Sequence, residues 1–396
     1  MTIPETEILT ALVSRVFRIE DITTDESPKG RLIRYRGQLL SDDSANAYDQ
    51  LAEYVKPYGL TPLFRIEKGK QTIYLAPAPE EQKLPNPWVN IVLFVATVFS
   101  VMLAGAQPES PMPANAGGQI LALLKAVFTG WPFALSLLSI LLAHEFGHYF
   151  VSRYHKTPAT LPYFIPFPLS PLGTMGAAIM MKGVPKNKRI LFDIGVAGPL
   201  AGMVIAIPVL ILGLSLSELG TIEASSSSFI EGNSILYLLA KFVVFGKFLP
   251  APADFGGLSP FLYWLRYFFT GSPAPIGGTD VFIHPVAFAG WAGLLVTALN
   301  LIPAGTLDGG HVIHSLLGDK ARKAFPFIVG LLIVLGFYWS GWWLWAFMLF
   351  WLGRVNAQTL DQITPLDSSR KLVAAVVIIL FVLVFTPVPF STLMGI

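Results

Sequence analysis

Seven apolar stretches, long enough to cross a lipid bilayer singly or as a hairpin, dominate the sequence after residue 83. A helix needs ~20 mostly apolar residues to cross the hydrocarbon core. The stretches lie near residues 88–105, 132–152, 190–214, 284–304, 323–339, 341–353 and 371–388. With 53% hydrophobic and 13% charged residues, the chain is too apolar for an ordinary soluble protein. We therefore expect a polytopic α-helical membrane protein with about seven transmembrane helices.

The first 83 residues have a different composition, with 11 of the 27 basic and 13 of the 25 acidic residues. Helical spacing covers 4–19 and 45–59, and strand-like runs lie at 31–39, 60–67 and 71–77. The last two runs predict a β-hairpin around residues 68–70. We expect a small soluble α+β domain over 1–83, then a linker, first transmembrane helix and external loop over 84–131. A membrane core follows over 132–320, with additional transmembrane helices over 321–396.

The loop charges predict the orientation, because Lys and Arg gather on the cytoplasmic side of membrane proteins. The loop after the second stretch contains Arg153, Lys156, Lys182, Lys186, Lys188 and Arg189. The 106–131 loop has one basic residue, and the 215–283 loop has three against five acids. We expect a cytoplasmic N-terminus and an external C-terminus. The start of the chain shows no signal or transit pattern, which favours a bacterial plasma membrane or thylakoid location.

Two further features of the composition exclude classes of function. A net charge of +2 gives no concentrated basic face, so we expect no nucleic-acid partner. The chain has no cysteine, which excludes Fe–S clusters and Cys-ligated zinc. A metal site in this chain would use His and carboxylate ligands.

The second apolar stretch contains the sequence "HEFGH", residues 144–148. On a helix, residues i and i+4 share one face, so His144 and His148 can bind one metal ion. Glu145 would lie beside them and deprotonate a metal-bound water. An unpaired carboxylate inside a membrane costs several kcal/mol, so such a cluster indicates a function rather than a structural accident.

Catalytic zinc generally takes three protein ligands, and Asp308 is the best third candidate. It lies in "ALNLIPAGTLDGG", where Pro and Gly interrupt the fourth stretch near its cytoplasmic end. His155 lies at the interface and His284 on the opposite side of the membrane from the motif. His311 and His314 are weaker alternatives because no acid lies between them.

The pairing of "HEFGH" with "NLIPAGTLDGG" closely resembles the site-2 protease family of intramembrane zinc metalloproteases. The elements "GTMGAA" at 173–178 and "GVAGPLAG" at 195–202 are also similar to family elements, so the resemblance covers about residues 130–320. It implies one Zn²⁺ per chain with His144, His148 and Asp308 as ligands. It further implies Glu145 as general base and acid, and Asn300 near the substrate carbonyl.

The resemblance implies a zinc endopeptidase that cleaves transmembrane segments of single-pass membrane proteins within the bilayer, after a first cut by an upstream site-1-type protease. No PDZ-like pattern is evident, and a soluble domain precedes the first span, so the chain looks most like the cyanobacterial and plant-plastid branch. Two alternatives remain open: a polytopic metal transporter using the same ligands, and an inactive scaffold that binds membrane proteins. The sequence leaves the oligomeric state open.

The segment 166–185 contains prolines and glycines that exclude a simple helix. We expect it to form a re-entrant β-hairpin near the active site, with "TMGAAIMM" as a strand that pairs with unwound substrate. The alternative is a structural surface loop. Asp193, near Arg189, is interpreted as an interfacial acid, and "GVAGPLAG" as a helix-packing surface.

Overall fold

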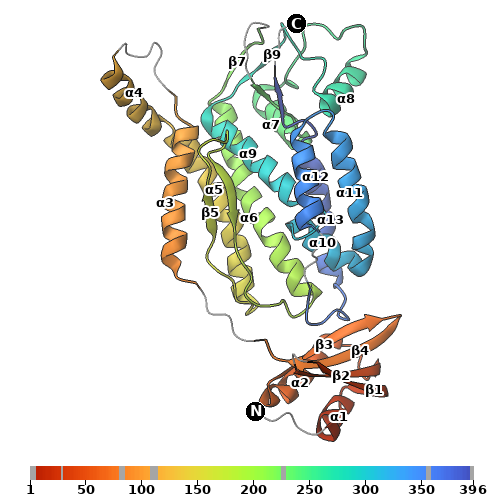
Figure 1. The fold of residues 1–396 in the computed structure, drawn as a ribbon. Helices are drawn as coiled ribbons and strands as arrows, with labels where there is room; N and C mark the ends of the chain where they lie inside the picture. Colours follow the sequence, from red (N-terminus) through yellow and green to blue (C-terminus); the bar gives the residue numbers. More distant parts are fainter. Residues whose placement is uncertain are drawn as a thin grey trace.

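The computed structural model describes residues 6–27, 30–79, 85–107, 115–223, 229–353 and 358–392. A bundle of helices forms most of the molecule, and a small sheet domain lies at one end of it (Figure 1). The last described residues lie at the opposite end of the bundle from this domain. The mainly helical architecture and the small N-terminal sheet domain therefore agree with the sequence analysis.

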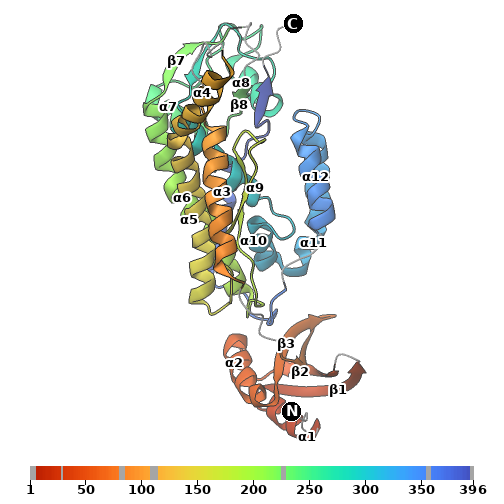
Figure 2. The same cartoon turned by 60° about the vertical axis from the view of Figure 1, so that its left-hand side comes forward.

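The N-terminal domain is a four-stranded antiparallel sheet with two helices packed on one face (Figure 2). Its elements are α1 (Thr6–Ser14), β1 (Phe17–Ser27), β2 (Gly30–Leu39), α2 (Ser44–Val55), β3 (Leu60–Glu67) and β4 (Lys70–Pro77). The strand order is β1-β2-β4-β3, so β3 forms one edge of the sheet. Leu9 and Leu51 from the helices pack against Ile33, Phe64 and Ile73 from the strands, and this apolar contact holds the two layers together.

The predicted β-hairpin is confirmed, since β3 and β4 pair in register from Leu60–Pro77 to Glu67–Lys70. The helix expected over 4–19 is too long, because the chain becomes strand β1 at Phe17. The pairing register of β1 shifts between Ile19 and Asp21. The predicted helix is too long because the buried residues Val13, Val16 and Phe17 keep helical spacing across the end of α1.

A helix occurs at each of the seven predicted apolar stretches. These are α3 (Pro87–Ala104), α5 (Trp131–Tyr154), α6 (Lys188–Ser215), α9 (Pro285–Asn300), α11 (Ala321–Leu335), α12 (Gly341–Leu352) and α13 (Ser368–Val384). Among the described residues, α3, α5 and α6 are long and apolar enough to cross a membrane. Seven membrane crossings remain a prediction, because the other four helices have 12 to 17 residues.

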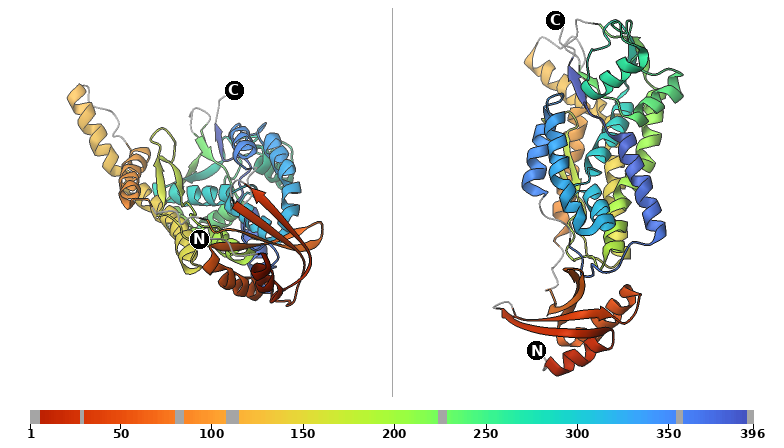
Figure 3. Two further views of the ribbon diagram at one scale, coloured as in Figure 1. Left: turned by 60° about the horizontal axis from the view of Figure 1, so that its bottom comes forward. Right: turned by 90° about the vertical axis from the view of Figure 1, so that its right-hand side faces the viewer.

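The core of the bundle lies where α5, α6 and α9 meet. Leu137, Ala206 and Ala292, one from each helix, are almost fully buried there. A two-stranded hairpin, β5 (Tyr163–Pro166) and β6 (Thr174–Ala178), runs alongside α3 (Figure 1). The short helix α10 (Asp308–Leu317) follows α9 after a turn and packs against α6. The right-hand view of Figure 3 shows the N-terminal domain below the end of the helical bundle. β6 covers the first five residues of the strand expected at 174–181. That the hairpin is re-entrant in a membrane remains a prediction.

The end of the bundle opposite the N-terminal domain has short elements that the sequence analysis left unassigned. They are α4 (Ala116–Thr129), β7 (Glu218–Thr221), β8 (Phe229–Glu231), α7 (Ile235–Phe245), α8 (Pro260–Thr270), β9 (Thr279–Phe282) and β10 (Phe390–Thr392). A fully buried lysine, Lys241, ties several of them together. Its Nζ lies 3.2 Å from Asp280 and 3.7 Å from Glu231, and 4.3 Å from the ring centre of Tyr237. These charges are buried as a compensated group.

We predict that Lys241→Ala destabilises this end of the molecule, because two carboxylates would remain buried without their cation. Breaking a buried ion pair costs about 3–5 kcal/mol. Thermal unfolding in detergent should show a clear fall in melting temperature. Lys247→Ala is the matched control, since this lysine is exposed on the same segment. Equal melting temperatures for the two variants would show that the buried ion group does not stabilise the fold.

Candidate metal centre

The helix α5 presents His144, Glu145 and His148 toward the inside of the bundle, where all three are buried. The i, i+4 spacing places the two imidazoles on one face of the helix. Their Nε2 atoms lie 3.2 Å apart. The local sequence thus fixes two metal-ligating nitrogens and one adjacent carboxylate on a single rigid element.

Asp308 reaches the same place from the first residue of α10. The helix α9 ends at Asn300, and the intervening turn brings the start of α10 back against the end of α9. A Cβ at Gly309 would lie 2.0 Å from the Leu301 carbonyl oxygen, and a Cβ at Gly310 would lie 2.3 Å from that of Gly305. The two glycines are therefore required because the backbones touch, and this close contact directs Asp308 toward α5.

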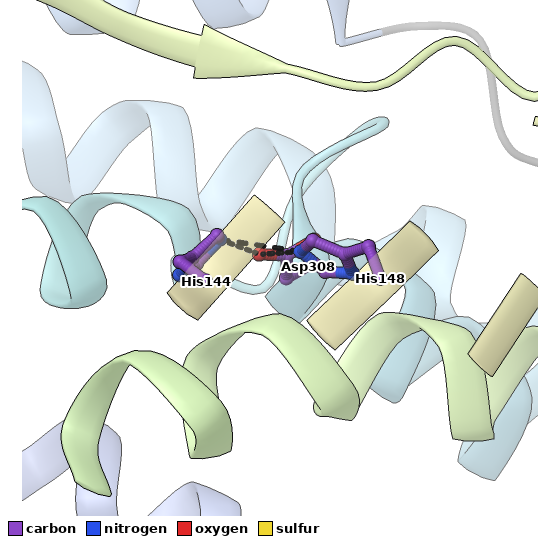
Figure 4. Close-up of side chains that lie close together, drawn as sticks. All are labelled: His144, His148 and Asp308. Atoms are coloured by element: carbon purple, nitrogen blue, oxygen red, sulfur yellow. Dashed lines mark hydrogen bonds and ion pairs between the residues drawn. The ribbon is translucent and has the colours of Figure 1, made fainter. Parts of the chain in front are cut away.

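Oδ2 of Asp308 lies 3.2 Å from Nε2 of His144 and 3.3 Å from Nε2 of His148 (Figure 4). The three atoms form a nearly equilateral triangle. Zinc bonds of 2.0–2.1 Å at tetrahedral angles require donor atoms about 3.3 Å apart. The residues present therefore fit a zinc ion with three protein ligands and a fourth position open.

Helix α6 orients the second imidazole. Nδ1 of His148 donates to the carbonyl oxygen of Ile194 at 2.7 Å, which leaves the Nε2 lone pair available for a metal. A Cβ at Gly198 would lie only 2.0 Å from Nε2 of His148, whereas one at Gly202 would lie 3.3 Å from His144. The "GVAGPLAG" sequence is thus a packing surface, as predicted, and it packs against the metal ligands themselves.

A cavity of about 480 Å³ opens onto the three ligands. Glu145 and Asn300 line it, and Nδ2 of Asn300 lies 3.3 Å from Nε2 of His144. Residues 177–179 at the end of β6 form another wall, so Ile179 lies in the same cavity lining as Glu145. The sequence analysis did not single out Ile179 as a site residue; the only signal for it was the predicted strand.

The other histidines lie as follows. His155 pairs with Asp193 at 3.0 Å, and His284 caps the start of α9. His311 lines the cavity beside Asp308. His314 is also buried, but it is not among the described residues that line this cavity. Only His144, His148 and Asp308 form a metal-binding group within the part of the chain that the structure describes.

Asp193 has basic partners, as the sequence predicts, but they are His155 and Arg370 and not the neighbouring Arg189. Arg370 from α13 binds both carboxylate oxygens of Asp193, at 2.8 and 2.6 Å. The Nε atom of Arg189 instead donates to the carbonyl oxygen of Pro365. Distant segments provide the partners, so sequence proximity could not identify them.

The family model of peptidase family M50 matches residues 132–337, just over half of the chain. This range contains both halves of the metal centre. No solved structure gives a significant match.

Curated relatives agree with the family match. The chain is 30% identical over 323 residues to "Probable zinc metalloprotease EGY1, chloroplastic" of Oryza sativa subsp. japonica, covering 76% of this chain and 50% of the relative. The Arabidopsis thaliana EGY1 protein is 29% identical, covering 65% and 43%. "Probable zinc metalloprotease EGY2, chloroplastic" of Arabidopsis thaliana is 25% identical, covering 99% and 66%.

The chain thus spans about half the length of the EGY1 relatives that it matches. These relatives are named zinc metalloproteases, in agreement with a donor set that fits zinc. From the family match, the relatives and the geometry together, we conclude that the chain is a member of peptidase family M50, the site-2 protease family of zinc metalloproteases, in its plant-plastid branch.

Proposed function

We propose that this protein is a zinc-dependent intramembrane endopeptidase that cleaves transmembrane segments of other membrane proteins. The observation that carries the proposal is the triangle of His144, His148 and Asp308, with Glu145 beside it in one cavity. Two of the ligands and the glutamate lie on α5, a helix that is apolar enough to cross a membrane. Hydrolytic groups at such a position act on substrates that are themselves in the bilayer.

Zinc at this site supplies a Lewis acid that polarises the scissile carbonyl and lowers the pKa of water. Glu145 then takes a proton from the attacking water and transfers it to the leaving amine nitrogen. Ile179 lines the same cavity, where its backbone N–H is the group proposed to orient the carboxylate. Water adds across the peptide bond, and two peptides leave without a covalent intermediate.

Asn300 and β6 would position the substrate. The amide of Asn300 is close to the metal ligands, where it can donate to the substrate carbonyl. A transmembrane substrate must unwind before cleavage, and its backbone groups then need new partners, because lipid offers none. β6 ends at the cavity and offers an edge with which an extended substrate can pair as an added strand.

The proposed topology has seven membrane crossings, with the N-terminal domain in the cytoplasm and the C-terminus on the other side. The basic residues in the loop after α5 support this orientation. The proposed substrates are single-pass membrane proteins, first shortened by another protease. A shortened substrate has lost most of its soluble part, so fewer polar residues must enter the helical bundle with its transmembrane segment.

We expect Glu145→Gln to retain zinc and to lose cleavage of a single-pass substrate by about 10²–10⁴-fold, because the proton acceptor is gone. Asp308→Ala should lose both zinc and cleavage. Zinc content by mass spectrometry and cleavage in detergent or liposomes measure the two effects. Glu53→Gln, an exposed glutamate of the N-terminal domain, is the control. Equal cleavage by wild type and Glu145→Gln would refute the assignment, and zinc transport that survives this substitution would indicate a transporter.

Gly198→Ala should lower zinc occupancy strongly, because the new methyl group would overlap the His148 ring. Gly202→Ala is the matched variant on the same helix, since its methyl group would make only a tight contact with His144. Zinc content of the purified, folded variants distinguishes them. If both keep one zinc per chain, α6 does not determine the position of His148.

Gly176→Pro should abolish cleavage while zinc binding persists, because Gly176 in β6 has φ +98° and proline is restricted to negative φ. Met175→Ala is the control, as it removes an exposed side chain and leaves the backbone unchanged. Cleavage by Gly176→Pro at the wild-type rate, with folding intact, would exclude β6 as the strand that receives substrate.

A further inference from the structure

Residues 359–364, between α12 and α13, form a segment that joins the N-terminal domain to the helical bundle. We call it the junction segment. On one side its backbone pairs with edge strand β3: the N–H of Phe64 donates to Leu360 at 2.9 Å, and that of Gln362 to Phe64 at 3.0 Å. On the other side, Leu360 N–H donates to Pro185 at 3.1 Å and Asp361 N–H to Lys186 at 2.7 Å. It is therefore the middle strand of a short three-stranded parallel arrangement.

Side chains fix the junction segment in this position. Asp361 is fully buried and accepts hydrogen bonds from the N–H groups of Ile363 and Thr364, at 2.8 and 3.1 Å. The guanidinium of Arg65 donates to the Leu360 carbonyl at 2.8 Å. Leu360 and Ile363 also pack against the core of the N-terminal domain. This is a specific docking contact rather than a chance approach of two surfaces.

The other end of the same path reaches the catalytic cavity. Pro185 follows Ile179, which lines the cavity together with Glu145, by six residues. Between them Met181 bridges to Ala159, and Lys182 N–H donates to Pro158 at 2.7 Å. Hydrogen bonds thus connect the sheet of the N-terminal domain, the junction segment and residues 185–186. From there the chain itself leads back to Ile179, in the cavity wall that it shares with Glu145.

The docking contact can open without unfolding either part. The N-terminal domain has its own apolar core between its helices and sheet. Backbone hydrogen bonds and polar contacts such as Ser44 to Thr364, at 2.9 Å, make up much of the boundary. A cavity of about 470 Å³ also lies across it, lined by Gln38, Ser41 and Asp42 on one side and Pro365 on the other. Water can replace these polar contacts when the domain is released.

We propose that the N-terminal domain is a regulatory module that activates the enzyme by docking. When it is docked on the junction segment, it fixes residues 185–187 and so places β6 and Ile179 correctly against Glu145. When it is released, this segment loosens and cleavage falls. The proposal rests on the protease function proposed above. Asp361 is a positioning residue in this arrangement and touches no substrate.

The test uses the full chain with zinc bound. Arg65→Ala combined with Gln362→Pro removes two hydrogen bonds of the docking contact, and cleavage should fall about tenfold, a typical coupling between sites. Zinc content should not change. Arg36→Ala is the control, because Arg36 lies in the same sheet and pairs with Asp21 instead.

Restoration by a disulfide separates released docking from misfolding. The chain has no cysteine, so adding Ser44→Cys and Thr364→Cys to the release variant allows one disulfide, where the two side-chain oxygens now lie 2.9 Å apart. Oxidation should restore cleavage, and a reductant should reverse it. The single-cysteine variants should show neither effect. A release variant that cleaves like wild type, or that stays inactive after oxidation, would overturn the proposal.

Amide hydrogen exchange gives a second measurement that does not depend on activity. Exchange over residues 174–187 should increase in the release variant and return on oxidation, whereas exchange in α5 and α6 should not change. Unchanged exchange over 174–187 would overturn the proposal. If wild type itself cleaves no substrate, the proposed protease function is refuted. The exchange measurement still decides whether docking of the N-terminal domain controls residues 174–187.

Discussion

The contact between α6 and the two ligand-bearing helices determines the arrangement of the metal centre. On the face of α6 that meets them, the His148 ring occupies the space that a side chain at position 198 would need. One turn earlier on the same face, a Cβ at Gly195 would lie 2.9 Å from that of His311, in the helix that begins with Asp308. A larger residue at either glycine would separate α5 from α10, and with them the ligands. Small residues on one helix therefore determine whether two distant motifs form one site.

The cavity at the candidate metal ligands also depends on elements outside the helices. A peptidase within an apolar bundle must provide polar partners for water and for an unwound substrate, because lipid provides none. β6 and the residues after it supply such groups beside Glu145. The same segment continues to the junction segment and the N-terminal domain. The N-terminal domain, which is remote from the candidate metal ligands in sequence, is thereby connected to the segment that forms the cavity wall beside Glu145.

Local patterns in the sequence predicted the elements but not all of their bounds. The apolar stretches identified the long helices, since hydrophobic length is a property of a single segment. The start of strand β1 was missed because Val13, Val16 and Phe17 continue a helix-like spacing beyond the end of α1. The end of the molecule that contains Lys241 was also missed, since three separate segments provide its ion partners and aromatic contacts. Pairing across such distances leaves no local periodicity to detect.

By itself the sequence determined that His144 and His148 share a helix face with Glu145 beside them, because helical periodicity is local. It also indicated Asp308 as a third ligand through resemblance to a family. Only the tertiary structure decided that the three donor atoms lie 3.2–3.3 Å apart, and that Ile179 lines the same cavity as Glu145. It alone placed the junction segment between β3 and residues 185–187. The distance between two packed helices depends on the volumes of all the side chains between them. These side chains come from several segments, so no single segment of the sequence determines the distance.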